Sequence, residues 1–151
     1  MRKIRNLNET VPIDFNKLQP DFSRICKENG VDMLYLFGSQ ARNDSTALSD
    51  VDMAFYVKEG LSSSAKLKLY QAFFSLFKRN DVDFVDLKIS NPLTSYKAIK
   101  EGVLLYCSDD LIRQNLEYKI QVKYLDTMHL REEFNKNLKK AILEGNFYDK
   151  N

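Results

Sequence analysis

Histidine is almost absent from this chain of 151 residues, and cysteine is scarce. The single histidine, His129, has no Cys, Asp or second His at ligand spacing, so it predicts neither a metal site nor a histidine-based catalytic pair. The two cysteines, Cys26 and Cys107, lie far apart in apolar surroundings and form no C-x-x-C motif, which favours two buried free thiols. Any chemistry is therefore expected to depend on other residue types.

The chain also lacks long apolar runs and a strong net charge. No run approaches the roughly 18 apolar residues of a membrane-spanning helix, and the charged residues 1–7 are followed by no apolar stretch that would make a signal peptide. A net charge of +2 is too small to predict direct nucleic-acid binding. With 44% hydrophobic residues, ten Phe and eight Tyr, the sequence predicts one globular domain over residues 1–151, located in the cytoplasm.

One polar stretch stands between two apolar runs. The run at residues 33–37 stops at Gly38-Ser39, ten residues follow, and Asp50-Val51-Asp52 begins the second run. Side chains alternate along a strand, so both carboxylates project the same way and can share a divalent cation, which relieves their repulsion. A glycine lets backbone N–H groups approach a phosphate, and a serine hydroxyl can donate to it. The pattern predicts a nucleoside triphosphate–Mg²⁺ site; the alternative is a surface loop with a solvated Asp pair.

A third carboxylate is expected from the β-prone run at residues 82–89. An Asp inside a strand is costly unless it is paired or bound to metal, and two-metal phosphoryl chemistry uses a third acid beside the first two. Asp83 is the first choice, and Asp86, which points to the other face, is the alternative. For both residues the alternative to metal binding is a purely structural one, in which the strand has an exposed acidic edge.

Charge is distributed unevenly along the chain. Residues 31–110 carry nine Lys/Arg against eleven Asp/Glu, whereas the numbers are six against four in residues 1–30 and eight against six in residues 111–151. The segment proposed to hold a polyanion is thus the acidic one. This favours a site in which metal ions supply the positive charge over a simple basic patch.

The motif resembles that of a known superfamily. Gly-Ser-Gln-Ala-Arg at residues 38–42, followed by Ser-Asp-Val-Asp at residues 49–52, is similar to the DNA polymerase β-type nucleotidyltransferases, and within them to the minimal nucleotidyltransferase (MNT) branch of MntA-type antitoxins paired with HEPN toxins. The segment 102–106, Gly-Val-Leu-Leu-Tyr, extends the similarity. Asn43 departs from it, because that branch usually has a second glycine there; Asn tolerates positive φ better than most residues.

The resemblance implies an activity and roles for particular residues. It implies transfer of AMP from ATP, with two Mg²⁺ ions, to a hydroxyl, with a tyrosine of a cognate HEPN toxin as the expected acceptor. Asp50, Asp52 and Asp83 would be the metal-binding and catalytic residues. The nucleotide would contact Gly38, Ser39 and Arg42. The alternatives are an antitoxin that neutralises its toxin by binding alone and a small-molecule, aminoglycoside-like nucleotidyltransferase.

Hydrophobic periodicity predicts an α+β (α/β-like) fold with a small mixed sheet and the nucleotidyltransferase element order. Strands are expected at residues 32–37, 51–57, 82–89 and 103–107, and helices at residues 16–29, 62–78 and 93–100. The apolar residues alternate within residues 51–57, which is expected to place Asp50 and Asp52 on one side of the sheet and the core on the other. The apolar stripe of the second helix is predicted to be Leu67, Tyr70, Phe73, Phe74 and Phe77. The core would span about residues 16–107.

A long helical extension follows at about residues 109–143. Its apolar residues recur every four positions and then shift in phase near Met128, which predicts two helices or a bend. The extension is longer than the sheet needs. It could therefore be a surface for the toxin partner or a simple covering helix.

Overall fold

The computed structural model describes residues 13–41 and 50–145. Its four strands form one mixed sheet in the order β3-β2-β1-β4: β1 is Met33–Phe37, β2 is Val51–Tyr56, β3 is Val82–Asp86 and β4 is Val103–Cys107. Strand β1 pairs antiparallel with both β2 and β4, and β2 pairs parallel with β3. The predicted α+β fold with a small mixed sheet is confirmed.

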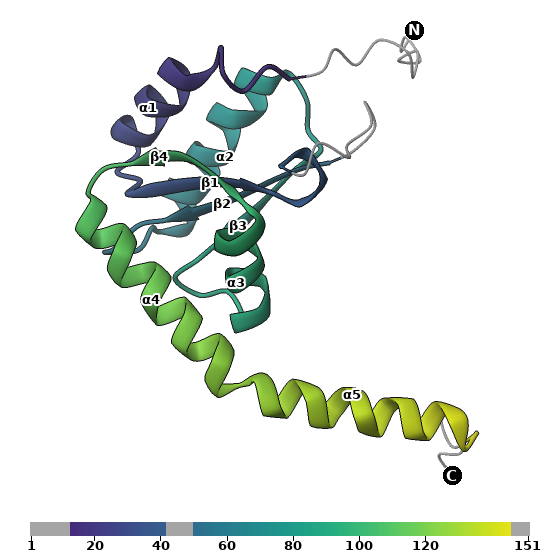
Figure 1. Cartoon of the computed structure of the whole chain (residues 1–151). Coiled ribbons are helices and arrows are strands. Elements are labelled where there is room, and N and C mark those ends of the chain that lie inside the picture. Colours follow the sequence, from purple (N-terminus) through teal and green to yellow (C-terminus); the bar gives the residue numbers. More distant parts are fainter. Residues whose placement is uncertain (1–12, 42–49, 146–151) are drawn as a thin grey trace, which may run out of the picture.

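Five α-helices accompany the sheet in the described part of the chain: α1 is Gln19–Glu28, α2 is Ser63–Phe77, α3 is Pro92–Glu101, α4 is Asp110–Asp126 and α5 is Met128–Leu143. A short 3₁₀ turn, η1 (Gly38–Gln40), follows β1. Figure 1 shows α1 and α2 on one face of the sheet, α3 and α4 on the other, and α5 extending away. None of the described helices is long and apolar enough to cross a membrane.

The first face of the sheet packs against α1 and α2. Alternate residues of β2, among them Val51 and Met53, are fully buried there, together with Phe22 of α1 and Phe73 of α2. The predicted stripe of α2 was wrong at Leu67, which is 56% exposed. Leu69 is buried in its place because the helix is rotated so that positions 69, 73 and 77 face the sheet.

The second face of the sheet is also covered, which corrects the expectation that the carboxylates lie on one side and the core on the other. Tyr35 and Ala54 project to this face and are buried against Ala98 of α3 and Leu116 and Ile120 of α4. The alternation was right, but apolar residues share this face with the acidic ones further along the strands. At the end of the sheet where β2 and β3 begin, Asp50 and Asp83 are exposed and Asp52 is half-buried.

Capping residues and turns set several boundaries. The Ser62 hydroxyl accepts from the N–H of Ala65 at the start of α2, and the Asn91 side chain accepts from Thr94 at the start of α3. The predicted strand at residues 82–89 ends earlier, at Asp86. The carbonyl of Asp86 accepts from the N–H groups of Ile89 and Ser90, which turns the chain away from the sheet.

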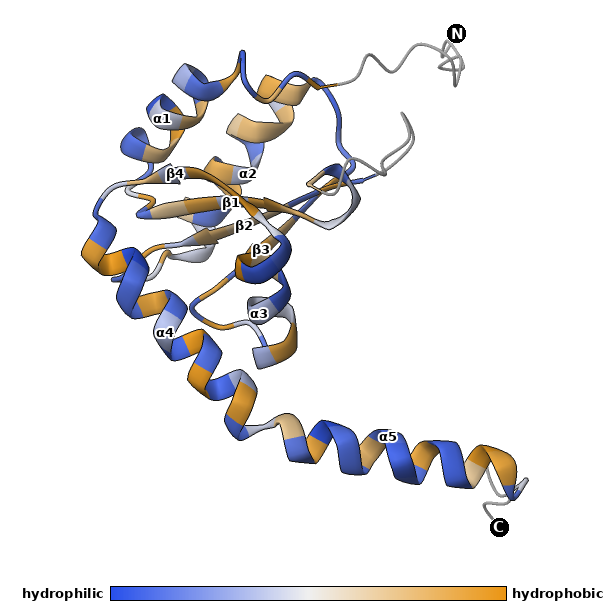
Figure 2. Cartoon of the chain, viewed as in Figure 1, coloured by the Kyte–Doolittle hydropathy of each residue, from blue (hydrophilic) through white to orange (hydrophobic). Residues whose placement is uncertain are grey.

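The C-terminal extension consists of two helices, in agreement with the predicted change of phase. The break is at Thr127, whose hydroxyl donates to the Lys123 carbonyl at 2.8 Å and accepts from the guanidinium of Arg131. The Arg131 guanidinium also lies over the ring of Tyr124. In the described chain α5 buries none of its residues, and its hydrophobic residues remain visible between polar ones (Figure 2).

Both cysteines are free thiols, as predicted. Cys26 is buried, and burial raises the pKa of its thiol to about 12. Cys107 is half-buried, so the expectation that both thiols are buried holds fully only for Cys26.

Candidate functional site

Carboxylates from two neighbouring strands meet at the open end of the sheet. Asp52 of β2 and Asp83 of β3 are register partners in the parallel pair. Directly paired residues project to the same face of a sheet, so Asp83 lies on the side of Asp52. Asp50 lies one residue before β2, two residues from Asp52, and is exposed, as is Asp83. The structure thus places Asp52 and Asp83 side by side, whereas Asp50 does not join them in a cluster of three acids among the described residues.

Gly38 lies directly against the Asp52 carboxylate. Register places the last residue of β1, Phe37, opposite Asp52, and the chain then turns into η1 with Gly38 at φ +71°. A Cβ built on Gly38 would lie 2.3 Å from Oδ2 of Asp52. Glycine is therefore required at position 38 for two reasons: its φ is positive, and the Asp52 carboxylate occupies the space that a side chain would need. Ser39 follows in the same 3₁₀ turn and is half-buried.

The alternative third acid, Asp86, lies on the opposite face. It is an ion-pair partner of Lys66 on α2, with 2.9 Å between Nζ and Oδ2, and only 9% of its side chain is exposed. It also accepts from the N–H of Lys88 at 3.0 Å. The hydrogen bond that Lys66 donates to Asp86 raises the pKa of Lys66, and the negative charge of Asp86 adds to the effect. The cost of burying Asp86 is thus compensated by a lysine, with no metal required.

Asp83 has no such compensation. In the described chain it has no hydrogen bond or ion pair, whereas Asp86, three residues away, has both. Among residues 13–41 and 50–145, no three His, Cys, Asp or Glu side chains are gathered closely enough to enclose a metal ion unaided. Mg²⁺ is commonly held by one or two carboxylates together with substrate phosphates and waters. The open pair of Asp52 and Asp83 fits an ion that arrives with a triphosphate.

Arg79 is a charged neighbour that the sequence did not single out. Its side chain is 8% exposed, and its guanidinium makes a two-point ion pair with the Asp81 carboxylate. This hydrogen bonding raises the pKa of Arg79, and the negative charge of Asp50 contributes in the same direction. The carbonyl of Asp81 accepts from the N–H of Val51 at 3.0 Å, which fixes the turn before β3 to the start of β2. A short Arg-x-Asp in a turn is too common a pattern to be recognised from sequence alone.

Residues 42–49 of the motif lie outside the described part of the chain. Arg42, predicted to contact the nucleotide, and Asn43, which departs from the related motif, belong to residues 42–49. Their roles stay predictions.

Comparison with protein families identifies the class. The family model "Polymerase beta, Nucleotidyltransferase" matches residues 21–111, which is more than half of the chain and includes every described residue of the candidate site. The chain belongs to this family, and it is a nucleotidyltransferase. No curated relative matches the chain.

Solved structures with a similar fold agree with the predicted resemblance. A toxin–antitoxin structure with AMP-PNP matches with a TM-score of 0.70 at 21% identity, covering 80% of this chain and 98% of the matched chain. A structure of tri-AMPylated Shewanella oneidensis HEPN toxin in complex with MNT antitoxin matches with a TM-score of 0.68 at 20% identity, covering 83% and 99%. An MntA–HepT toxin–antitoxin structure matches with a TM-score of 0.66 at 20% identity, covering 82% and 98%. At these identities the likeness concerns the fold.

Proposed function

We propose that this protein is an antitoxin that transfers AMP from ATP to a tyrosine hydroxyl of a cognate HEPN-type toxin in the cytoplasm. The observation that carries the proposal is the pairing of Asp52 with Asp83 at an open sheet end, with Gly38 packed against the Asp52 carboxylate. Family membership supports nucleotidyl transfer. The similar folds of an antitoxin in complex with an AMPylated HEPN toxin and of a toxin–antitoxin with AMP-PNP support the acceptor and the nucleotide.

In this proposal the nucleotide lies against the turn after β1. Gly38, with no side chain, lets backbone N–H groups approach the triphosphate, and the Ser39 hydroxyl donates to a phosphate oxygen. Arg42 would neutralise phosphate charge nearby. These contacts align the α-phosphorus for in-line attack.

Asp50, Asp52 and Asp83 would hold two Mg²⁺ ions. When bound with ATP, Mg²⁺ neutralises phosphate charge and lowers the pKa of the acceptor hydroxyl. Asp83 would orient the acceptor side of the site, and Asp50 and Asp52 the triphosphate side. In the reaction the acceptor oxygen forms a bond to the α-phosphorus, the bond between the α-phosphorus and the oxygen that bridges to the β-phosphate breaks, pyrophosphate leaves, and the hydroxyl proton passes to solvent water.

The toxin would bind along the C-terminal helices. Leu130, Phe134 and Ile142 of α5 are 56%, 66% and 58% exposed, and Leu138 is on the same helix at the spacing of one turn from Phe134. An apolar stripe of this kind on a helix that has no buried residue in the described chain is typical of a surface that a partner buries.

The experiment combines the purified protein with labelled ATP, Mg²⁺ and the toxin encoded beside it. Label should pass to the toxin, a tyrosine of the toxin should carry AMP by mass spectrometry, and Asp52→Asn should abolish the transfer. Lys68→Gln, at an exposed lysine of α2 on the far face, is the matched control and should transfer normally. Transfer that persists in Asp52→Asn, or that needs no divalent cation, contradicts the proposal.

A second candidate is an antitoxin that neutralises its toxin by binding alone. The exposed apolar residues of α5 favour it, as does Asn43 at a position where related motifs usually have glycine. Neutralisation of the toxin without label transfer would favour this candidate, and Phe134→Asp should then abolish neutralisation while Asp52→Asn leaves it intact.

A further inference from the structure

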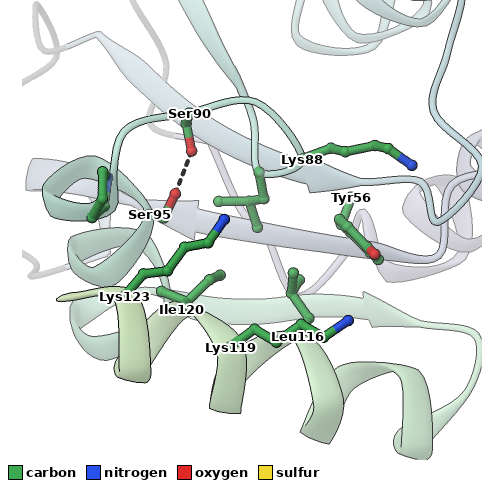
Figure 3. A pocket seen from close by; sticks show the side chains of 10 residues that line it. Tyr56, Lys88, Ser90, Ser95, Leu116, Lys119, Ile120 and Lys123 are labelled. Carbon is green, nitrogen blue, oxygen red and sulfur yellow. Dashed lines mark hydrogen bonds between the residues drawn. The ribbon is translucent and has the colours of Figure 1, made fainter. Parts of the chain in front are cut away.

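A second site of different chemistry lies between the sheet and α4. It is a hollow of about 140 Å³ whose apolar floor includes Leu116 and Ile120 of α4. Polar groups surround this floor (Figure 3): the ammonium groups of Lys119 and Lys123 come from α4, and the hydroxyls of Ser90 and Ser95 come from the β3–α3 connection and from α3. Nothing in the proposed transfer reaction uses these groups.

The charge of the hollow has one sign. Three lysines and no Asp or Glu are among the residues that line it. The ammonium of Lys88 already donates a hydrogen bond to the carbonyl of Lys58. Lys119 and Lys123 have no hydrogen bond or ion pair with any part of the described chain. They are four residues apart on one helix, where like charges repel.

A hydroxyl pair supplies a further donor. Ser95 is 4% exposed, and its Oγ is hydrogen-bonded to Oγ of Ser90. Each hydroxyl has one proton, and a hydrogen bond between two hydroxyls uses only one of the two protons. One proton of the pair is therefore available to another acceptor. Figure 3 shows Lys123 extending into the hollow on the side of Ser95.

The two ends of the hollow differ in electrostatic surroundings. At the end with Tyr56, burial raises the pKa of the phenol, and the negative charges of Asp32, Glu59 and Asp86 raise it further. An anion is therefore disfavoured beside Tyr56. The favourable place is the other end, beside Lys123, Ser90 and Ser95, where the first turn of α3 also contributes the positive end of its helix dipole.

We propose that this end of the hollow binds a phosphate group, either as inorganic phosphate or as the phosphate of a mononucleotide. Lysine ammonium groups bind phosphate as point charges, and a hydroxyl donor complements a tetrahedral oxygen set. The volume accommodates one such group but no nucleoside beside it, so a base and sugar would extend outward. None of Gly38, Ser39, Asp50, Asp52 and Asp83 is among the residues that line the hollow, so the site is separate from the carboxylates.

The test is a titration followed by amide NMR on the full chain, with ¹⁵N labelling and without Mg²⁺, toxin or ATP. Inorganic phosphate should give saturable shifts at the amides of Ser90, Ser95 and Lys123. The double variant Lys119→Gln/Lys123→Gln should weaken binding at least tenfold. Its matched control is Lys136→Gln/Lys139→Gln, two exposed lysines of α5, which should bind as the wild type does.

Two further ligands identify the source of the phosphate. AMP binding with tenfold higher affinity than inorganic phosphate supports a mononucleotide, and equal affinities support inorganic phosphate; adenosine should not bind in either case. Absence of saturable shifts, unchanged affinity in the double variant, shifts confined to Gly38 and Ser39, or equal binding of adenosine and AMP would each overturn the inference. Because no transfer is measured, a failure of the proposed reaction leaves this result unaffected.

Discussion

The acidic residues on the two faces of β3 have opposite surroundings. Asp86 faces α2, is nearly buried, and is satisfied by the ammonium of Lys66 and the N–H of Lys88. Asp83, on the other face, is exposed, lies in register with Asp52 and has no partner in the described chain. One carboxylate is thus used for stability, and the other keeps its charge available.

This contrast teaches how a small sheet can build a site for cations. Carboxylates held side by side destabilise each other, and a protein compensates them unless they serve a ligand. The absence of a compensating partner for Asp83 in the described chain, beside Asp52 and Gly38, supports the assignment of function to that face. The following substitutions test the difference between the two faces, beginning with the largest expected effect.

Asp52→Asn should cause the greatest loss of activity. Asp52 is the acid that the other parts of the site surround, because Gly38 packs against it and Asp83 is its register partner. We expect AMP transfer to fall about a thousandfold, which corresponds to about 4 kcal/mol of transition-state stabilisation. The measurement is label transfer to the toxin, with thermal unfolding as the check that the fold persists. Activity above a tenth of the wild-type value would remove Asp52 from the proposed site.

The matched pair Asp83→Asn and Asp86→Asn compares the two faces directly. Asp83→Asn should lower transfer about a hundredfold and leave the free energy of unfolding nearly unchanged, because no contact is lost. Asp86→Asn should do the reverse: it should keep activity within about threefold and destabilise the fold by about 1–2 kcal/mol through the weakened contact with Lys66. Chemical denaturation and label transfer measure both. If the two variants exchanged these effects, the third acid would be Asp86.

Gly38→Ala tests the backbone that adjoins the acids. An alanine at φ +71° costs about 1–2 kcal/mol, and its Cβ would force the Asp52 carboxylate to move. We expect a loss of about that amount in stability and about tenfold or more in transfer. Gly30→Ala is the matched control, because it has a similar positive φ of 68° but nothing within 4 Å of the built Cβ. It should lose stability alone; equal losses of activity in both variants would show that strain, and not contact with Asp52, matters.

Much of this architecture follows from the sequence by simple periodicity. The alternation of residues 51–57 predicted the apolar and acidic sides of β2, and the phase shift near Met128 predicted the break between α4 and α5. The choice between Asp83 and Asp86 needed coordinates, because strand register and the position of Lys66 depend on contacts distant in sequence. The roles of the site residues stay predictions.

Other features could not be read from local patterns. Leu67 and Leu69 are both compatible with a helical stripe that contains Phe73, and only packing against the sheet selects Leu69. The packing of α3 and α4 on the second face of the sheet depends on contacts between elements that are distant in sequence. The alternation within β2 suggested that only one face is covered, and this local pattern cannot report such tertiary contacts. The buried Arg79 beside Asp50 was not predicted because its partners lie in a turn without periodicity.

The smallest change in stability is expected from a substitution in the part of the Asp52–Asp83 face that α3 and α4 cover. The Tyr35 hydroxyl donates to Oε1 of Glu117 on α4 at 2.8 Å, and Tyr35 is 2% exposed. Tyr35→Phe removes this link between sheet and helix. Because Glu117 also accepts from Arg113 and is 26% exposed, its oxygen stays solvated and the loss of stability should be only about 1 kcal/mol.

Tyr118→Phe is the control for this substitution. Tyr118 lies on α4, as Glu117 does, but is 69% exposed, so its loss should change stability by less than about 0.5 kcal/mol. Transfer should be unaffected in both variants, because this contact lies at the end of the face that the apolar residues close. A loss of activity in Tyr35→Phe comparable to that in Asp83→Asn would mean that the covered and open parts of the face act as one unit.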